Sequence, residues 1–326
     1  MLSKPLSTKY IPMKLAFIVN GNIKNHLKLV NAINGLFSGY KSRTYVSESA
    51  GQFNSLCKKA LSSQCNHLVF VGGDGSLNEG VNGLLAYYKL GAGNQPEAYD
   101  WTAVQKIKIG VLPAGSANDF VKSLYPKIDL TILKALIDKG TTQRLDVGWV
   151  RFQHVNQQMS HRFFMNITDV GMGAEAVKIK EKLPRWLGAA ISYFWAIIRT
   201  IALYKKRRIK AFNKSFFWEG KMINLVVAKG RYFGNGLGIA PNADLFDGKF
   251  SLVIIGNLGL LDYFKNLGTL RSCRKLSHPE VRYHRCKEIT ITSADSQEIG
   301  IEMDGEYIGE TPINLKCLQS KITFLS

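Results

Sequence analysis

The segment from Asn66 to Leu85, NHLVFVGGDGSLNEGVNGLL, constrains the fold of this chain more than any other. It begins with a short apolar run that ends on Gly72 and Gly73, and from Leu77 onward apolar residues recur at helical spacing. The segment therefore predicts a strand, a sharp turn and a helix. Glycines in such a turn let a ligand approach the backbone, and the free N–H groups at the start of the helix attract anions such as phosphate.

The turn carries an aspartate, Asp74, where the common phosphate-binding loop GxxxxGK[ST] has a lysine. A carboxylate and a phosphate repel each other unless a cation lies between them. Asp74 is therefore expected to act through a magnesium ion or to accept a proton from an attacking hydroxyl, and both roles belong to phosphoryl transfer. A glycine-rich turn without a ligand is the alternative that this segment leaves open.

Strands and helices alternate through the first part of the chain. These elements are predicted at 14–19, 26–36, 43–46, 52–61, 67–71, 107–112 and 128–138. Such alternation predicts parallel strands in an α/β domain, whose ligands bind at the carboxyl ends of the strands. Asn20, Ser47 and Asp74 each follow one of these strands.

A second turn of the same kind follows the strand at 107–112. The sequence PAGSANDF places a hydroxyl, Ser116, and a carboxylate, Asp119, shortly before a helix. Two strand ends therefore offer a hydroxyl and a carboxylate each.

After about residue 140 the pattern changes to antiparallel strands. They are predicted at 143–151, 162–168, 209–218, 222–228, 249–255, 288–292 and 299–302, with a hairpin turn at Glu219 and Gly220. A run of strands separated by glycine turns is typical of a sandwich or a curved sheet.

The net charge indicates the kinds of partner, and the cysteine content indicates the cellular location. The 43 Lys and Arg residues and 24 Asp and Glu residues give a net charge of +19, which attracts nucleic acid, acidic phospholipid or a polyphosphate. The five cysteines form no CxxC pair, which favours reduced thiols in the cytoplasm over disulfides or a zinc site. The first residues lack the apolar core of a signal peptide, which also favours a cytoplasmic location.

Six motifs in order resemble one known superfamily. GGDGSLNEGVNGL at 72–84 and LPAGSANDF at 112–120 are similar to the catalytic domain of the diacylglycerol kinase and sphingosine kinase superfamily, above all to its soluble bacterial lipid kinases. Further matches are LDVG at 145–148, NITDVGMGAEAV at 166–177, APNADLFDGKFSLVII at 240–255 and MDGE at 303–306. The GGDG turn by itself is shared with NAD kinases.

The resemblance implies two domains with a cleft between them. An N-terminal doubly wound domain at 13–140 binds ATP, and a β-rich, sandwich-like domain at 141–317 takes the lipid. The last strand, within 318–326, returns to the first domain.

The resemblance also assigns roles to residues. It implies that Asp74, Asp119 and Asp146 belong to a network that holds a catalytic magnesium ion. It implies that Glu306 is the general base, with Asp74 as the second candidate. ATP contacts are implied for Asn20, Ser47, Gly73, Asp74, Gly75, Ser76, Leu77, Asn78, Glu79 and Ser116.

The resemblance also implies a second metal site, and the chain departs from the family pattern at the end of its first strand. A structural magnesium ion is implied at Asp244, Asp247 and Lys249, and a plain Asp-Gly turn is the alternative. The first strand end, usually NPxSG, reads Asn20-Gly21-Asn22-Ile23-Lys24 here, so the nucleotide preference stays open.

The most apolar stretch, 186–204, is long enough to cross a bilayer, but Arg199 within it makes that costly. We expect a helix of the second domain, either buried or with one side lining the lipid pocket or touching a membrane. Two basic sets would attract anionic lipid. They are Lys205, Lys206, Arg207, Arg208 and Lys210, and Arg271, Arg274, Lys275, Arg282, Arg285 and Lys287.

The hypothesis from sequence is thus a cytoplasmic, peripherally membrane-bound lipid kinase that uses ATP and Mg²⁺. Its substrate would be a lipid alcohol such as diacylglycerol, a sphingoid base or ceramide, and a homodimer is an open option. One alternative is a kinase of a soluble alcohol, similar to NAD kinase. Another is a non-catalytic, basic lipid- or nucleic-acid-binding protein, although no nucleic-acid-binding motif is found and a nucleic-acid partner is not expected.

Overall fold

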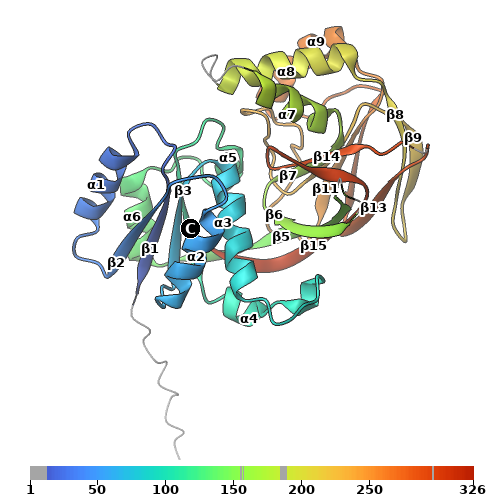
Figure 1. Cartoon of the computed structure of the whole chain (residues 1–326). Coiled ribbons are helices and arrows are strands. Elements are labelled where there is room, and N and C mark those ends of the chain that lie inside the picture. The colour runs from blue at the N-terminus through green and yellow to red at the C-terminus, as the bar shows by residue number, and fades with distance from the viewer. Residues whose placement is uncertain (1–12, 155, 157, 184–188, 296) are drawn as a thin grey trace, which may run out of the picture.

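The computed structural model of this chain describes residues 13–154, 156, 158–183, 189–295 and 297–326. Figure 1 shows two halves side by side: an α/β half formed by the first part of the chain and a β-rich half formed by the remainder. The predicted fold class, an α/β domain followed by a β-rich domain, is confirmed.

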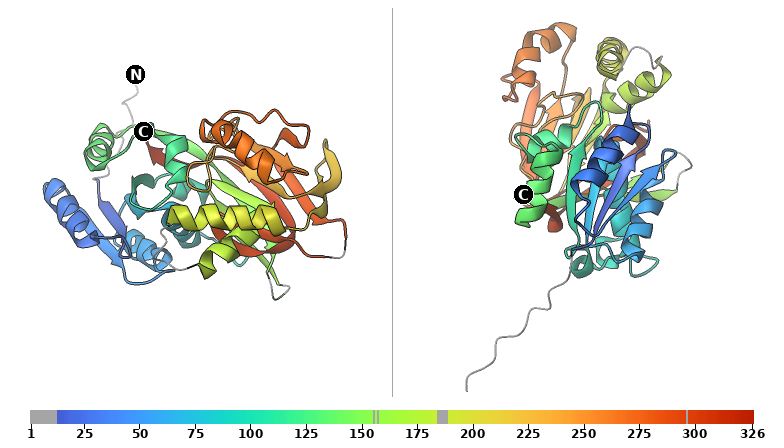
Figure 2. Two further views of the ribbon diagram at one scale, coloured as in Figure 1. Left: turned by 90° about the horizontal axis from the view of Figure 1, so that it is seen from above. Right: turned by 90° about the vertical axis from the view of Figure 1, so that its left-hand side faces the viewer.

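Four parallel strands form the sheet of the first half. In spatial order they are β4 (Lys108–Pro113), β3 (His67–Gly72), β1 (Leu15–Asn20) and β2 (Ser42–Ser47). Helices cover both faces, which explains why the central strands are buried along almost their whole length. One face carries α2 (Phe53–Ser62), α3 (Asp74–Tyr87), α4 (Trp101–Val104) and α5 (Asp119–Leu124), and the other carries α1 (His26–Leu36) and α6 (Leu130–Lys139). Figure 2 shows this arrangement from two further sides.

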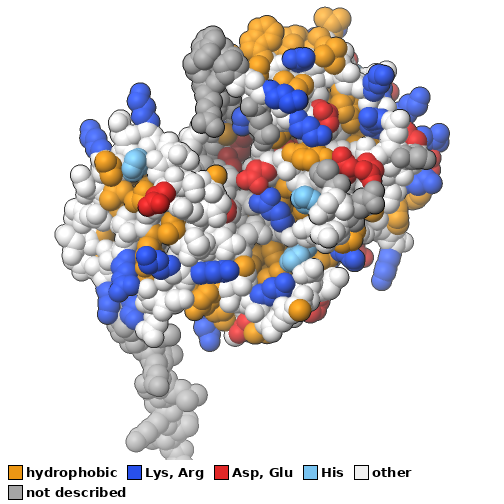
Figure 3. Space-filling view, in the orientation of Figure 1, with side chains coloured by type: hydrophobic (Ala, Val, Ile, Leu, Met, Phe, Trp, Pro, Cys, Tyr) orange, Lys and Arg blue, Asp and Glu red, His pale blue; other side chains and the backbone are white. Residues whose placement is uncertain are grey.

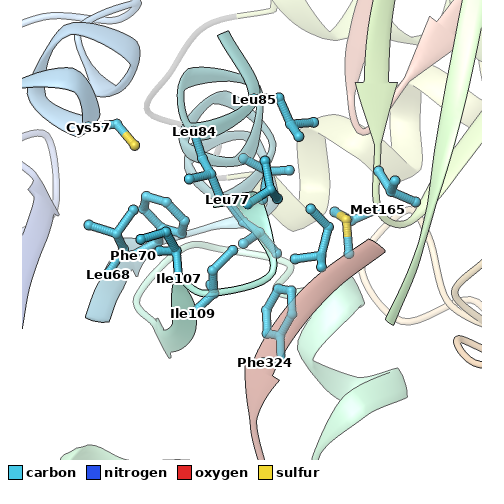
Figure 4. Packing of buried hydrophobic residues seen from close by; sticks show 14 of the residues in the cluster. Cys57, Leu68, Phe70, Leu77, Leu84, Leu85, Ile107, Ile109, Met165 and Phe324 are labelled. Carbon is cyan, nitrogen blue, oxygen red and sulfur yellow. The ribbon is translucent and has the colours of Figure 1, made fainter. Parts of the chain in front are cut away.

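The core of the first half also contains residues from the second. Figure 4 shows Leu77 of α3 in the same cluster as Phe70 of β3, together with Met165 and Phe324 from the later part of the chain. All four side chains are buried. This cluster therefore spans the junction of the two halves.

The second half is a sandwich of antiparallel strands. One layer contains β7 (Ile167–Gly171), β14 (Gly300–Met303), β10 (Asn224–Ala228), β11 (Phe250–Ile255) and β12 (Val281–Cys286). The other contains β5 (Thr142–Gln153), β6 (Met159–Phe164), β8 (Arg207–Phe212), β9 (Phe217–Met222), β13 (Glu288–Ser293) and much of β15 (Glu306–Leu325). A buried apolar cluster lies between the layers. The helices α7 (Met172–Lys182), α8 (Ala189–Leu203) and α9 (Leu260–Arg271) lie at the top in Figure 1, where α8 and α9 pack on β10 and β11.

The long strand β15 connects the halves. It pairs with β5, β13 and β14 in the second half, and its last residues run parallel to β4, with Thr323 opposite Lys108. Figures 1 and 2 show its end, marked C, among the elements of the first half. The predicted boundary after residue 140 falls at Gly140, where α6 ends. Because one sheet runs through both halves, the division at 140 and 141 stays a prediction.

Two local predictions are wrong. The strand predicted at 162–168 is interrupted at 165–166, between β6 and β7. Glu219 and Gly220 lie inside β9 rather than in a turn. The turn is at 213–216, where the Asn213 side chain accepts a hydrogen bond from the Ser215 N–H (2.8 Å).

Gly220 has a packing role in its strand. A Cβ atom there would lie 2.7 Å from the Trp218 ring, so only glycine leaves room for that ring.

Candidate active site

A cleft of about 390 Å³ lies between the two halves, at the carboxyl ends of β3 and β4. Its other wall comes from the loop at 233–235 and the turn at 304–306 of the second half. Figure 3 shows a hollow between the halves in which acidic side chains gather. The volume is within the usual range for small-ligand sites.

Two glycine turns form the floor of this cleft. A Cβ atom on Gly115 would lie 2.4 Å from the Cα of Gly73, so the backbones of the two turns are in direct contact. Helix α3 begins at Asp74, which leaves the N–H groups of its first turn without partners inside the helix. The floor therefore offers backbone donors and a helix N-terminus to an anion.

The Asp74 carboxylate joins these two turns by hydrogen bonds. Its two carboxylate oxygens accept hydrogen bonds from the N–H groups of Asp119 and Phe120, both at 2.9 Å. Burial raises the pKa of Asp74, and the two N–H donors partly offset that effect. Each carboxylate oxygen can accept a further contact, so Asp74 can also face a metal ion.

Asp119 links the floor to the second half. Its Oδ1 atom forms an ion pair with Lys122 (2.8 Å), and its Oδ2 atom accepts a hydrogen bond from the N–H of Asn235 (2.9 Å). The side chain is buried at the edge of the cleft.

Glu306 enters the cleft from the opposite wall. Its Oε2 atom forms an ion pair with Arg162 (2.9 Å), whereas its Oε1 atom lies 3.9 Å from the position of a Cβ on Gly75. Arg162 also donates to Asn78 (3.1 Å), which fixes the guanidinium. The structure therefore brings Glu306 and Asp74 into one cleft. Arg162 was not predicted from the sequence, because nothing local indicates its partner 144 residues away.

The turn that carries Glu306 is held by buried carboxyl groups. Asp304 accepts hydrogen bonds from the N–H of Ile167 (2.9 Å) and from the side chain of Asn78 (2.7 Å). Burial raises its pKa to about 7, and the nearby Asp74 carboxylate adds to that increase. Glu302 accepts a hydrogen bond from the Gly305 N–H, and burial beside Asp169 raises the pKa of both carboxyls. The MDGE motif is visible in the sequence, but only its glutamate was predicted to have a role, and the buried Asp304 was missed.

Six of the predicted nucleotide contacts line the cleft. They are Asn20, Gly73, Asp74, Gly75, Ser76 and Ser116. The amide of Asn20 donates to the Ser76 hydroxyl (3.0 Å), so the first and third strand ends meet there.

Four other predicted contacts support the cleft instead of lining it. Ser47 is buried and accepts a hydrogen bond from the Gly21 N–H (3.2 Å), and the side chain of Leu77 lies in the core. Asn78 donates to Phe163 and Asp304, and Glu79 accepts from the N–H of Phe53 at the start of α2. The structure does not place these four residues on the surface of the cleft, and their contact with the nucleotide stays a prediction.

Asp146 does not belong to the cleft. It is 0% exposed, and its carboxylate accepts hydrogen bonds from Lys229 (2.7 Å), the Gly248 N–H (2.6 Å) and the Ser320 N–H (2.8 Å). The structure therefore does not bring Asp146 together with Asp74 and Asp119, and its place in the catalytic magnesium network stays a prediction.

The predicted structural magnesium site does not fit either. The ammonium of Lys229 contacts both the Asp247 carboxylate (3.2 Å) and the Lys249 carbonyl (2.9 Å). The third predicted ligand is the main-chain oxygen of Asp244, whose side chain accepts a hydrogen bond from the Phe246 N–H (2.8 Å).

The cleft itself fits a magnesium ion that arrives with phosphates. Within the described ranges, no group of three or more His, Cys, Asp or Glu residues could hold a metal ion unaided. Magnesium commonly takes only one or two carboxylates and completes its shell with phosphate oxygens and water. Asp74 and Asp119 meet that requirement.

Comparisons with known proteins agree with the two-part architecture. Residues 14–150 match the diacylglycerol kinase catalytic domain, and residues 166–326 match the YegS C-terminal NAD kinase beta sandwich-like domain. A diacylglycerol kinase of Staphylococcus aureus (strain Newman) is 27% identical over 295 residues, which cover 87% of this chain and 82% of that protein. A diacylglycerol kinase of Staphylococcus epidermidis (strain ATCC 12228 / FDA PCI 1200) is 26% identical over 290 residues, with the same two coverages of 87% and 82%.

Solved structures show the same fold. A diacylglycerol kinase structure from Bacillus anthracis str. Sterne matches with a TM-score of 0.67 at 17% identity, covering 96% of this chain and 97% of that one. Yeast NADH kinase complexed with NADH matches with a TM-score of 0.53 at 11% identity, covering 97% of this chain and 84% of that one. The fold is thus shared with structures named as a diacylglycerol kinase and an NADH kinase.

Proposed function

The chain carries a diacylglycerol kinase catalytic domain and a YegS-type C-terminal domain, which make it a kinase of the diacylglycerol kinase superfamily, and from this premise we propose a more specific activity. We propose that it transfers the γ-phosphoryl group of ATP, with Mg²⁺, to the hydroxyl of a lipid alcohol such as diacylglycerol, a sphingoid base or ceramide. The observation that carries the proposal is that Asp74 and Asp119 from one half and Glu306 from the other line one cleft.

The nucleotide phosphates would lie on the floor of the cleft. The contact between Gly73 and Gly115 brings the two turns close enough to present their backbone to one ligand. The first turn of α3 supplies N–H donors and the positive end of a helix dipole. Asn20 and Ser116 border the same space.

Asp74 and Asp119 would hold the magnesium ion, which neutralises phosphate charge when it is bound. Both side chains are fixed by the backbone contacts described above, so their oxygens need little reorganisation. Preorganised charges of this kind supply most of the transition-state stabilisation in phosphoryl transfer.

Glu306 would accept the proton of the lipid hydroxyl. Its Oε2 atom is bound to Arg162, and its Oε1 atom is the one nearer the GGDG turn. Oε1 is therefore the oxygen suited to receive a proton as the hydroxyl attacks the γ-phosphorus. Arg162 and the turn at 304–305 position this carboxylate.

The test is incubation of the purified chain with labelled ATP, Mg²⁺ and a total lipid extract, followed by identification of the labelled product. We expect a phosphorylated lipid. Asp74→Ala should abolish its formation, and Glu306→Gln should lower kcat by about 100- to 10,000-fold, because positioned bases contribute that much. Both variants should keep the wild-type circular dichroism spectrum.

Asp138→Asn is the matched control, because Asp138 lies on α6 in an ion pair with Lys134 and outside the cleft. It should leave turnover unchanged. A parallel incubation with NAD that yields labelled NADP while no lipid is labelled, or lipid turnover unaffected by both cleft substitutions, would contradict the proposal.

The proposal includes peripheral association with an anionic membrane. No helix among the described residues is long and apolar enough to cross a membrane. A lipid kinase must nevertheless reach its substrate at a lipid surface. The helices α8 and α9 expose apolar residues such as Trp195 and Leu261 beside basic residues such as Arg199 and Lys265, and such a surface is suited to that contact. The cytoplasmic location and the homodimer stay predictions.

A further inference from the structure

Lys229 is buried where a divalent cation was expected. The residue follows β10 and is 0% exposed. Its ammonium contacts three oxygens: Asp146 Oδ2 at 2.7 Å, the Lys249 carbonyl at 2.9 Å and Asp247 Oδ1 at 3.2 Å. An ammonium has three N–H donors, so this set satisfies it completely.

The same oxygens cannot hold a metal ion while Lys229 is present. Magnesium requires oxygen ligands at about 2.0–2.1 Å and calcium at about 2.3–2.6 Å, so either ion would have to occupy the position of the ammonium. The local charge is also balanced already. Asp146 and Asp247 contribute two negative charges, and Lys229 and Arg285, which forms an ion pair with Asp247, contribute two positive charges.

We propose that the Lys229 ammonium is the built-in cation of the turn at 244–249 and takes the place of a structural metal ion. The lysine fastens this turn to Asp146 of β5, and Asp146 in turn binds the Ser320 N–H of β15 (2.8 Å). One side chain thus joins the turn to two strands of the sheet. This proposal concerns stability and does not depend on the proposed lipid substrate.

A substitution that removes the ammonium should create a metal site. Lys229→Ala would leave two carboxylates and a carbonyl facing one buried space. Such hard oxygen donors suit Ca²⁺ or Mg²⁺.

The experiment measures the Tm of the full chain in EDTA, in Mg²⁺ and in Ca²⁺, without nucleotide. In EDTA, Lys229→Ala should lower Tm by roughly 5–15 °C, because it leaves buried charges unpaired. Ca²⁺ or Mg²⁺ should restore part of that loss, and a second substitution, Asp247→Asn, should abolish the restoration. With Lys229 in place, the single substitution Asp247→Asn should leave the response of Tm to metal the same as in the wild type.

Lys134→Ala is the matched control, because it removes an ammonium from a partly exposed ion pair with Asp138. It should change Tm little, and metal should not alter the effect. If Lys229→Ala does not fold, the metal response of Tm in the wild type and in Asp247→Asn still tests the proposal. A metal-dependent rise in wild-type Tm that Asp247→Asn removes would overturn the proposal, as would a metal-insensitive Lys229→Ala.

Discussion

Gly73 and Gly115 set the spacing of the two turns on the floor of the cleft. Their backbones touch, and no side chain fits between them. The turns come from neighbouring strands, β3 and β4, so a small separation there would move Asp74 relative to the N-terminus of α5. The carboxylates and the backbone donors depend on this one contact.

We predict that Gly115→Ala lowers kcat/KM for lipid phosphorylation by roughly 10- to 100-fold, since displacements of about 1 Å have costs of that size. The added Cβ would lie 2.4 Å from the Cα of Gly73 and must push the turns apart. Steady-state kinetics measures the effect. Gly35→Ala on α1 is the control, because a Cβ there meets nothing within 4 Å. Equal kinetics for both variants would contradict this role.

Sequence reasoning found residues whose signal is local. Asp74 and Ser116 stand in glycine turns directly after apolar strands, so their place in the cleft could be predicted. Lys229 and Arg162 could not be found in this way, because their partners are distant in the sequence and their neighbours form ordinary strands. The same holds for the burial of Asp146, which depends on the lysine that faces it.

At the scale of elements, α8 and α9 form an apolar face at the top of the second half. Trp195 of α8 is 55% exposed and Leu261 of α9 is 74% exposed. The other exposed apolar residues of this face are Ile191, Phe194, Leu203 and Phe264. Figure 3 shows orange side chains here with blue basic ones around them. The exposed basic residues on and next to these helices are Arg199, Lys205, Lys206, Arg208, Lys265, Arg271, Arg274 and Lys275.

The structure refines the apolar stretch predicted at 186–204. Its first residues, within 184–188, lie outside the described residues, and the remainder forms α8. One side of α8 is buried, with Ala196 and Ile197 against the sheet, and the other is exposed. Contact between α8 and α9 makes the exposed side part of a larger face, which sequence could not show because the helices are far apart in the chain. Arg285 of the second basic set is engaged by Asp247 instead.

We predict that Trp195→Asp combined with Phe264→Asp abolishes co-sedimentation with vesicles of phosphatidylcholine and phosphatidylglycerol. The changes remove apolar area and add negative charge that the anionic surface repels. Phe217→Asp on β9 is the control, because Phe217 is also an exposed aromatic residue but lies on another element. Binding that survives the double substitution, or is lost equally in the control, would contradict a docking role for this face.

At the scale of the whole molecule, three carboxyl groups are buried near the junction of the halves. Burial raises the pKa of Asp304 to about 7 and also raises the pKa values of Asp169 and Glu302. In the unfolded chain such groups ionise near pH 4. Between these pH values the native state holds protons on these groups that the unfolded state has released, so the contribution of these three carboxyls to stability is largest at acidic pH and falls as pH rises toward 7.

We predict that between about pH 4 and pH 7 Asp304 makes the free energy of unfolding fall with rising pH, by up to about 1.4 kcal/mol per pH unit. Asp304→Asn should reduce this slope, because the amide does not titrate. Urea denaturation at several pH values measures it. Glu97→Gln, at an exposed site, should keep the wild-type slope. An unchanged slope in Asp304→Asn would show that Asp304 is already ionised in the native protein.

The fold class could be predicted because hydrophobic periodicity is local and the change from alternating elements to strands is visible in the sequence. The continuity of the sheet could not, since it depends on pairs such as Thr323 with Lys108 that no local pattern specifies.

Strand β15 is synthesised after the α/β half, but it is needed to complete the sheet of that half. Translation produces the α/β half first, but the second neighbour of β4 comes much later in the chain, in β15. Until β15 has left the ribosome, one edge of β4 has no partner and Phe324 is missing from the core. The α/β half can therefore finish folding only after the β-rich half has been synthesised.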